Sequence, residues 1–182
     1  MITTRAGRIG FYREYLDPLN IPGAPDKAAD TPLDHAPLAG PVTSLDKILK
    51  SELGGRLDPA AETFLDMFAE DGVLECPFAP PSALRRLAGK AAIADYYQRL
   101  TAIQGSDGMV LTASYTAVDP AYGLLEYDGM VRNKRDGGTY RQRYLAVVTI
   151  VGGRITLFRE YWSPLPLVAS FGPAGPLPLA EA

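Results

Sequence analysis

Four long stretches of alternating apolar and polar residues, joined by short turns, constrain the fold of this chain more than any other feature. They cover residues 109–118, 122–132, 139–151 and 154–162. An alternation with a period of two predicts strands, because successive side chains of a strand point to opposite faces. Pairs such as Asp119-Pro120 and Gly152-Gly153 separate the stretches and are typical of tight turns. The second half of the chain is therefore predicted to form an antiparallel meander.

Helical spacing dominates before this meander. Residues 45–53 place their apolar side chains on one helical face behind Ser44, a residue type that caps helices. Residues 59–68 and 90–100 repeat apolar positions at i, i+3, i+4 and i+7. Helices followed by a run of strands are typical of an α+β domain, in which the helices cover one face of the sheet. We therefore expect one α+β domain over residues 42–168, with a small apolar pocket between helices and sheet.

Composition and charge argue against several classes of function. The chain has 18 Lys and Arg and 21 Asp and Glu residues, for a net charge of −3, whereas a nucleic-acid surface needs clustered basic residues. One cysteine, Cys76, and one histidine, His35, are too few for a disulfide or a zinc site. No apolar run reaches the roughly 18 residues that cross a membrane, and the first residues lack the apolar stretch of a signal peptide. We therefore predict a cytoplasmic protein without a metal or cofactor and without nucleic-acid or membrane partners.

The start of the chain repeats a later part of it. Residues 7–20 match residues 153–166 at a constant offset of 146, and eight of the fourteen positions are identical. Because this offset is about one whole domain, residues 1–20 are interpreted as a remnant of the last strand of a preceding, similar domain. Met1 would then stand at the position of Val147. The alternative is a spare strand that pairs with a sheet edge in this chain or in a partner.

Two further segments lack any apolar period. Residues 21–41 are rich in Pro and Ala and are predicted to be a linker, and residues 169–182 are predicted to be a Pro- and Gly-rich tail. The domain itself is expected to lie between them.

Three segments of this domain resemble the SnoaL-like proteins. They are residues 68–80, 87–93 and 153–165. SnoaL-like proteins belong to the nuclear transport factor 2-like superfamily, together with ketosteroid isomerase and limonene epoxide hydrolase. The resemblance implies a cone-shaped, strongly curved, mostly antiparallel sheet packed over three N-terminal helices, with a small-molecule ligand in the open end. It also implies dimers, here either a homodimer or a fused tandem pseudo-dimer.

Glu160 is the leading candidate for catalysis. In the pattern of limonene epoxide hydrolase, an acidic residue between Arg and Tyr on the last strand activates water, and Glu160 has those two neighbours. Alternation places Glu160 on one face with Phe158 and Trp162, where desolvation would raise the pKa of its carboxyl and suit general acid or base work. The alternative is an ion pair of Glu160 with Arg141 or Arg143 across the sheet.

Asp128 is a candidate for a second carboxylate. The hydrolase pattern has an Arg-x-Asp pair near this point, and with a shift of one residue Asp128 takes the Asp position while Glu126 replaces the Arg. Loss of that Arg removes the cation that bridges the two acids. Without the shift the two positions fall on Tyr127 and Gly129, and nothing of the pair is retained. The alternative for Asp128 and Glu126 is an exposed strand face.

Cys76 stands where the ketosteroid isomerase pattern has its proton-transferring Asp. A thiol without a nearby base carries protons poorly near neutral pH, so Cys76 is interpreted as a small apolar wall of the pocket rather than a reactive thiol. The oxyanion hole of that isomerase also has no counterpart in the sequence. Steroid-isomerase chemistry in its usual form is therefore not expected.

The predicted pocket combines these residues with several others. Its expected lining residues are Leu74, Cys76, Tyr97, Tyr144, Phe158 and Trp162, of which a tyrosine could donate a hydrogen bond to a substrate oxygen. The equipment suits cofactor-free isomerisation, cyclisation or water addition on a small, mostly apolar, oxygenated substrate. The alternative is a non-catalytic ligand-binding or assembly domain with a degenerate active site.

Overall fold

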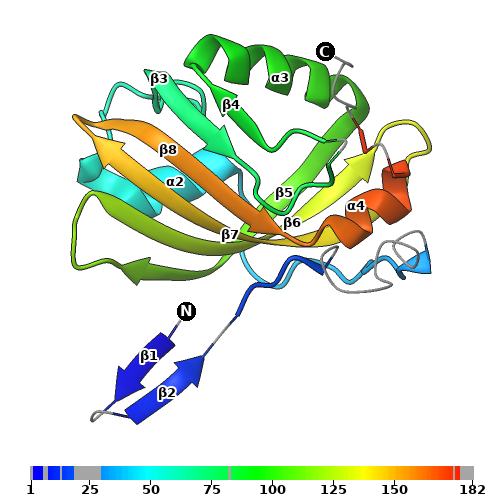
Figure 1. Cartoon of the computed structure of the whole chain (residues 1–182), viewed down its shortest axis with the longest axis horizontal. Helices are drawn as coiled ribbons and strands as arrows, with labels where there is room; N and C mark the ends of the chain where they lie inside the picture. Colours follow the sequence, from blue (N-terminus) through cyan, green and yellow to red (C-terminus); the bar gives the residue numbers. More distant parts are fainter. Residues whose placement is uncertain are drawn as a thin grey trace.

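Six strands form one open sheet in the order β4-β3-β8-β7-β6-β5 (Figure 1). Neighbouring strands are antiparallel, except for β3 and β8, which run parallel. The strands are β3 (Phe68–Glu75), β4 (Arg86–Ala88), β5 (Gln104–Thr116), β6 (Tyr122–Asn133), β7 (Thr139–Val151) and β8 (Arg154–Trp162). The structure, a computed structural model, describes residues 2–5, 8–12, 14–18, 30–81, 83–173 and 175–176. The predicted α+β class and its meander of four long strands are confirmed, and curvature of the sheet into a cone remains a prediction.

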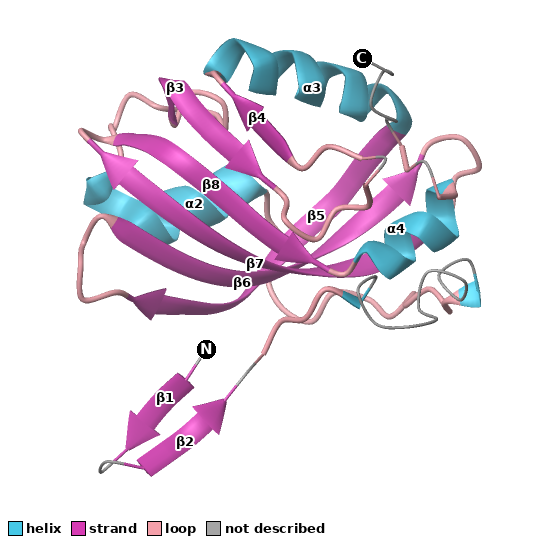
Figure 2. Cartoon of the chain, in the orientation of Figure 1, coloured by secondary structure: helices cyan, strands magenta, loops and turns pink. Residues whose placement is uncertain are grey.

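Two of the three expected N-terminal helices are present. They are α2 (Leu45–Leu53), continued by a short 3-10 turn η3 (Gly54–Arg56), and α3 (Lys90–Ile103), which lies over β3 and β4 in Figure 2. Their apolar faces turn inward, with Leu49 of α2 and Ile93 of α3 completely enclosed, whereas Tyr96, Tyr97 and Leu100 of α3 are only partly buried. Both helices therefore close one face of the sheet.

The helix predicted over residues 59–68 is wrong. This stretch forms turns, and its last residue, Phe68, begins β3. The Asp66 carboxylate accepts hydrogen bonds from the backbone N–H of Thr63 at 2.9 Å and from its hydroxyl at 2.7 Å. Asp58 likewise accepts from the backbone N–H of Ala60 at 2.8 Å. Such local bonds between side chain and backbone compete with helical hydrogen bonds, which explains why the apolar spacing does not produce a helix here.

A helix that the sequence pattern did not indicate follows β8. It is α4 (Pro164–Phe171), which begins with proline in its first turn, where a missing N–H costs nothing. Its buried residues Leu167 and Phe171 pack with Val131 and Tyr140 of the sheet. The predicted tail from residue 169 therefore begins inside a packed helix, and the third helix is C-terminal rather than N-terminal.

A β-bulge interrupts the pairing of β7 with β8 between Thr149 and Ile150. Strict alternation would put Ile155 and Phe158, three residues apart, on opposite faces, yet both are completely buried in the same apolar core. Thr156 is the extra residue of β8, because Ile155 and Leu157 pair with consecutive residues of β7. The bulge therefore decides which side chains of β8 face the helices.

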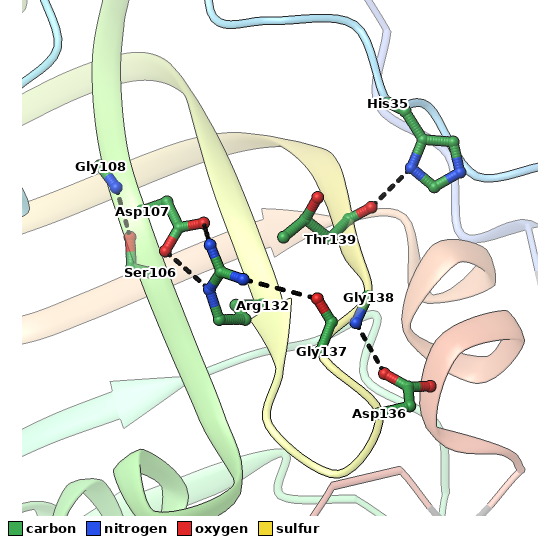
Figure 3. A network of polar contacts seen from close by, with 9 residues as sticks. All are labelled: His35, Ser106, Asp107, Gly108, Arg132, Asp136, Gly137, Gly138 and Thr139. Carbon is green, nitrogen blue, oxygen red and sulfur yellow. Dashed lines mark hydrogen bonds and ion pairs between the residues drawn. The ribbon is translucent and has the colours of Figure 1, made fainter.

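Polar contacts fix the turn between β6 and β7 (Figure 3). Arg132 donates from Nε to Asp107 of β5 at 3.0 Å, and the backbone N–H of Gly138 donates to the Asp136 carboxylate at 2.8 Å. Nδ1 of His35 lies 2.6 Å from the backbone oxygen of Thr139. These contacts tie the turn to β5 and to the segment that contains His35.

Two more strands form a separate two-stranded sheet near the N-terminus. They are β1 (Ile2–Arg5) and β2 (Arg8–Tyr12), and Figure 1 shows them apart from the six-stranded sheet. Of the predicted linker and tail, residues 21–29, 174 and 177–182 lie outside the described residues. No helix in the described part of the chain is long and apolar enough to span a membrane.

Candidate functional site

A cavity of about 80 Å³ lies where α3, the C-terminal end of β3, β7, β8 and α4 meet. Of the residues predicted to line a pocket, the structure places around this cavity Leu74, Cys76, Tyr97, Tyr144 and Trp162. Phe158 lies elsewhere, in the apolar core, where its ring contacts that of Phe64 edge to face at 5.2 Å. Phe158 is thus a residue of the apolar core and does not line the cavity.

Glu160 lines this cavity. The Tyr127 hydroxyl donates a hydrogen bond to Oε1 of Glu160. Burial raises the pKa of the Glu160 carboxyl to about 7, and the hydrogen bond from Tyr127 offsets part of this rise because it favours the charged form. A carboxyl group with such a pKa changes its protonation state near neutral pH.

Tyr127 reaches Glu160 across the intervening strand β7. In the sheet register Glu160 faces Ala146, which faces Leu125 on β6. The small side chain of Ala146 leaves room above β7, and the Tyr127 ring stacks on Tyr144 with centroids 5.1 Å apart. The tyrosine pair therefore covers the space between β6 and Glu160.

The predicted alternative of an ion pair for Glu160 is not what the structure shows. Arg143 instead binds Asp128, with Nε 3.0 Å from Oδ1, and Arg141 binds Asp34, with Nε 2.8 Å from Oδ2. Both arginines lie on the face of the sheet opposite the cavity. The hydrogen bond to Glu160 therefore comes from the Tyr127 hydroxyl and not from an arginine.

The structure does not bring Asp128 together with Glu160, and its prediction as a second carboxylate of the site is therefore corrected. Tyr127 points to the helices, and by alternation its neighbours Glu126 and Asp128 point to the other face. There Asp128 pairs with Arg143, and Glu126 accepts a hydrogen bond from the Tyr115 hydroxyl at 3.1 Å. Both acids are buried rather than exposed, so the alternative of a solvated strand face is also wrong.

Asp128→Asn is expected to change neither the cavity nor the titration of Glu160. The Arg143 side chain is 55% exposed but that of Asp128 only 9%, and a hydrogen bond to a charged group of this kind contributes about 1.5 to 3 kcal/mol. Urea unfolding should therefore show a loss of that size or less, and an NMR titration should give the same pKa for Glu160 as in the unchanged chain. A shifted Glu160 titration would contradict this placement.

Cys76 lies beside Glu160 in the cavity wall. Burial, and next the negative charge of Glu160, raise the pKa of the Cys76 thiol far above its usual value. The thiol therefore stays protonated, and a protonated thiol is a poor nucleophile. This environment agrees with the interpretation of Cys76 as a small apolar wall.

The sequence prediction of the site did not include Tyr127, nor four polar residues that line the cavity, namely Tyr96, Gln104, Tyr140 and Gln142. Tyr127 could have been found from the β6–β7 turn, which fixes its register opposite Tyr144. Gln142 and Gln104 also line the cavity, and the side-chain oxygen of each is buried without a hydrogen bond from any described residue. Gln104 could not be found from the sequence pattern. The strand that carries it, β5, begins directly at the end of α3, five residues before the start predicted from the alternation.

The described residues contain no group of three or more His, Cys, Asp or Glu side chains that could hold a metal ion. The chemical equipment of the cavity is therefore one carboxyl group, several phenols and two amides, within apolar walls.

Comparison with known proteins gives three findings. The family model of the SnoaL-like domain matches residues 57–158. The uncharacterised protein YesE of Bacillus subtilis is 30% identical over 126 residues, which cover 68% of this chain and 84% of that protein. An uncharacterised PhzA/B-like protein of Pseudomonas aeruginosa is 30% identical over 112 residues, which cover 62% of this chain and 79% of that protein.

Among solved structures, a proposed isomerase from Bacillus subtilis has a similar fold. Its TM-score is 0.61 at 27% sequence identity, and the match covers 72% of this chain and 94% of that chain.

Proposed function

Because this chain belongs to the SnoaL-like domain family, we propose that its cavity carries out cofactor-free acid–base chemistry on a small, mostly apolar, oxygenated substrate. Isomerisation, cyclisation and water addition are the reaction types that suit it. Glu160 is the group that moves the proton, and the neighbouring phenols hold the substrate oxygen. The nuclear transport factor 2-like fold supports the coarser part of this proposal, a domain that binds small molecules.

The position of Glu160 is the observation that carries the proposal. A carboxyl group with a pKa of about 7 is about half ionised at neutral pH, so it can take a proton from carbon or water and return it. The Tyr127 hydrogen bond orients the carboxylate, since it fixes one oxygen and leaves the other for the substrate. One base at the end of an apolar cavity is enough for proton transfer next to a carbonyl group.

The tyrosines supply hydrogen-bond donors for a developing oxyanion. Burial raises the pKa of the Tyr97 and Tyr144 hydroxyls well above the usual value, so both remain protonated at neutral pH. A protonated phenol in a site with little water stabilises a negatively charged oxygen effectively. Tyr97 and Tyr144 therefore serve as donors rather than as bases.

The rest of the lining limits the substrate. Leu74, Leu100 and Trp162 provide apolar walls, and the amide oxygens of Gln104 and Gln142 can accept hydrogen bonds from a hydroxyl or amino group. A cavity of about 80 Å³ is well below the roughly 300 to 1,000 Å³ of pockets for drug-sized ligands. The cavity therefore favours a small substrate.

Exchange and hydration assays on small probes test the proposal. The purified chain is incubated in D₂O with cyclohexanone, 2-cyclohexenone or acetylacetone, and loss of the α-proton signals is followed by NMR, with hydration of cyclohexene oxide measured in parallel. Acceleration of at least one reaction that disappears in Glu160→Gln is the expected result. Binding of a probe without any acceleration would contradict an enzymatic role.

A binding domain without catalysis is the second candidate, and two observations favour it. Cys76 stands where the isomerase pattern has an acid, and Asp128 lies outside the cavity. Under this alternative, ligands bind with equal affinity to the unchanged chain and to Glu160→Gln. Calorimetry with the same probes separates the two functions.

Removal of the Tyr127 hydroxyl should move the titration of Glu160 to higher pH. Its hydrogen bond favours the charged carboxylate, so Tyr127→Phe is expected to raise the pKa of Glu160 above about 7. NMR titration of glutamate carbons labelled with ¹³C measures this directly. Tyr144→Phe is the matched control, because the Tyr144 ring lies in the same stack without a hydrogen bond to Glu160; an unshifted pKa in Tyr127→Phe would show that the bond is not formed in solution.

Three further expectations remain proposals: curvature of the sheet into a cone, a dimer, and a cytoplasmic location. The fold of the family supports the first two. Light scattering on the purified chain measures the dimer directly.

A further inference from the structure

The β1–β2 hairpin repeats the end of the β7–β8 hairpin in its pairing as well as in its sequence. The pairs of the first hairpin are Ile2–Tyr12, Thr3–Phe11, Thr4–Ile9 and Arg5–Arg8. The corresponding pairs of the second hairpin are Val148–Phe158, Thr149–Leu157, Ile150–Ile155 and Val151–Arg154. Every pair coincides at the offset of 146 seen in the sequence. The irregularity in the pairing also coincides, since it falls between Thr3 and Thr4 in one hairpin and between Thr149 and Ile150 in the other.

We infer that β1 and β2 are the last hairpin of a second SnoaL-like unit. The remainder of that unit, with which the hairpin pairs, is formed by polypeptide joined to Met1. A β-bulge is a specific feature of a fold, retained because it directs side chains. Two hairpins that share sequence, register and bulge therefore belong to the same place in two copies of one domain.

The hairpin lacks the neighbours that such a place provides. In the described domain β7 pairs with β6, and β8 pairs with β3, so both outer edges of the hairpin are covered. β1 and β2 pair only with each other among the described strands. A lone two-stranded hairpin is marginally stable in water. The missing neighbours are thus equivalents of β3 and β6.

The burial of the equivalent residues in β8 also indicates that the hairpin belongs against the remainder of a SnoaL-like unit. Ile155 and Phe158 have no exposed surface in the described domain, because they lie in its apolar core. Ile9 and Tyr12 take the same two register positions in the first hairpin. The occupant that fits is therefore a body of helices and sheet that can bury these two positions.

A second copy of this chain does not offer that place. Its β6 and β3 are already paired with its own β7 and β8. The edges that remain are those of β4 and β5, which are not neighbours of the equivalent hairpin. The partner is consequently a unit without a last hairpin of its own.

If Glu160 has the proposed function, Glu14 would have the same function in the second unit. It stands at the position of Glu160, and it is exposed here, whereas Glu160 faces the cavity. Completion of the second unit would enclose Glu14 and supply that unit with its own carboxyl group. The segment would then bring an active-site residue as well as two strands.

A fusion protein tests the inference. Residues 42–146 of this chain are placed directly before Met1, which supplies a body without its last hairpin. If the inference is right, β1 and β2 complete that body, and hydrogen exchange of residues 2–12 slows by about 100-fold or more relative to the unfused chain. Because the readout is protection rather than turnover, it is independent of any catalytic activity.

Matched variants make the test specific. Ile9→Asp should abolish the protection in the fusion, since its equivalent Ile155 is completely buried, whereas Arg5→Asp should retain it, since its equivalent Val151 is 61% exposed. In a positive control, residues 147–162 replace residues 1–16 of the fusion. Protection in the positive control without protection of residues 2–12 overturns the inference.

If the positive control does not fold, the coding DNA before Met1 decides. A frame that continues upstream through a segment similar to residues 42–146 supports the inference, and a stop codon directly before Met1 overturns it. Protection of residues 2–12 in the unfused chain at high protein concentration alone would also overturn it, because it would show pairing between copies.

Discussion

Glu160→Gln is expected to lower the turnover of any substrate of this cavity by about 10²- to 10⁴-fold, the usual contribution of a general acid or base. Glutamine has nearly the same size and can still accept the hydrogen bond from Tyr127, so the cavity keeps its shape. What is lost is the exchangeable proton of a carboxyl group whose pKa lies at about 7. Steady-state rates with the probe that is turned over fastest measure the effect.

Asp128→Asn is the matched control for this loss. It also changes a buried carboxylate to an amide on the sheet, but its side chain faces away from the cavity and binds Arg143. Turnover of Asp128→Asn should remain within about twofold of the unchanged chain, because Asp128 does not line the cavity. Equal losses in both variants would point to a general effect on folding and would remove Glu160 from its role.

The second large effect is on stability, and it does not depend on a substrate. The pKa of the Glu160 carboxyl is about 7 in the folded chain and 4.5 ordinarily. Between these values the unfolded chain loses its proton while the folded chain keeps it, so the free energy of unfolding falls as the pH rises from about 4.5 to 7. The difference corresponds to on the order of 3 kcal/mol at pH 8.

Glu160→Gln removes this cost, because an amide does not ionise. The variant and the unchanged chain should therefore have similar stability at pH 4.5, and the variant should be more stable by on the order of 3 kcal/mol at pH 8. Urea unfolding of both proteins across this range isolates the contribution of Glu160 from that of other titrating groups. A constant difference over the whole range would show that the carboxyl group is not desolvated.

The opposite directions of the two effects are informative. A variant that loses activity while it gains stability at pH 8 identifies a residue kept for function at a cost to folding. A purely structural residue would lose stability when replaced. Glu160 is thus distinguished from the buried acids Glu126 and Asp128, which have hydrogen-bonding or ionic partners on the other face.

The long strands and their order could be predicted because their signals are local. Alternation defined β6, β7 and β8 within one or two residues, and the Gly-rich turns defined their connections. The side-chain direction of Glu160 followed from Phe158 and Trp162 on the same strand. Local patterns therefore sufficed for the strand that carries the principal candidate residue.

Other features depended on contacts between distant residues. The helix expected over 59–68 is replaced by turns, in which Asp58 and Asp66 bind nearby backbone groups. The opposite holds for α4, where the sequence predicted no helix and a tail from residue 169, although the helix is buried against β6 and β7. Apolar spacing and proline content alone do not distinguish these cases.

The residues around Glu160 required the sheet register. Tyr127 lies on β6, two strands away, and meets Glu160 only because Ala146 intervenes on β7. A shift of one residue in the comparison with the hydrolase pattern selected Asp128 instead, and one residue is enough to change the face of a strand. Pattern matching could find the carboxyl group but not its partner.

The bulge of β8 determines which changes of length related genes can tolerate in this hairpin. Thr156 is the extra residue, and Ile155 and Leu157 on either side of it already pair with consecutive residues of β7. Loss of the Thr156 codon would therefore turn the bulge into regular pairing and leave Glu160 on its present face, whereas loss of a codon between Phe158 and Glu160 would turn the glutamate to the opposite face. Relatives in which this hairpin is one residue shorter should accordingly be aligned by strand register before their signature residues are compared.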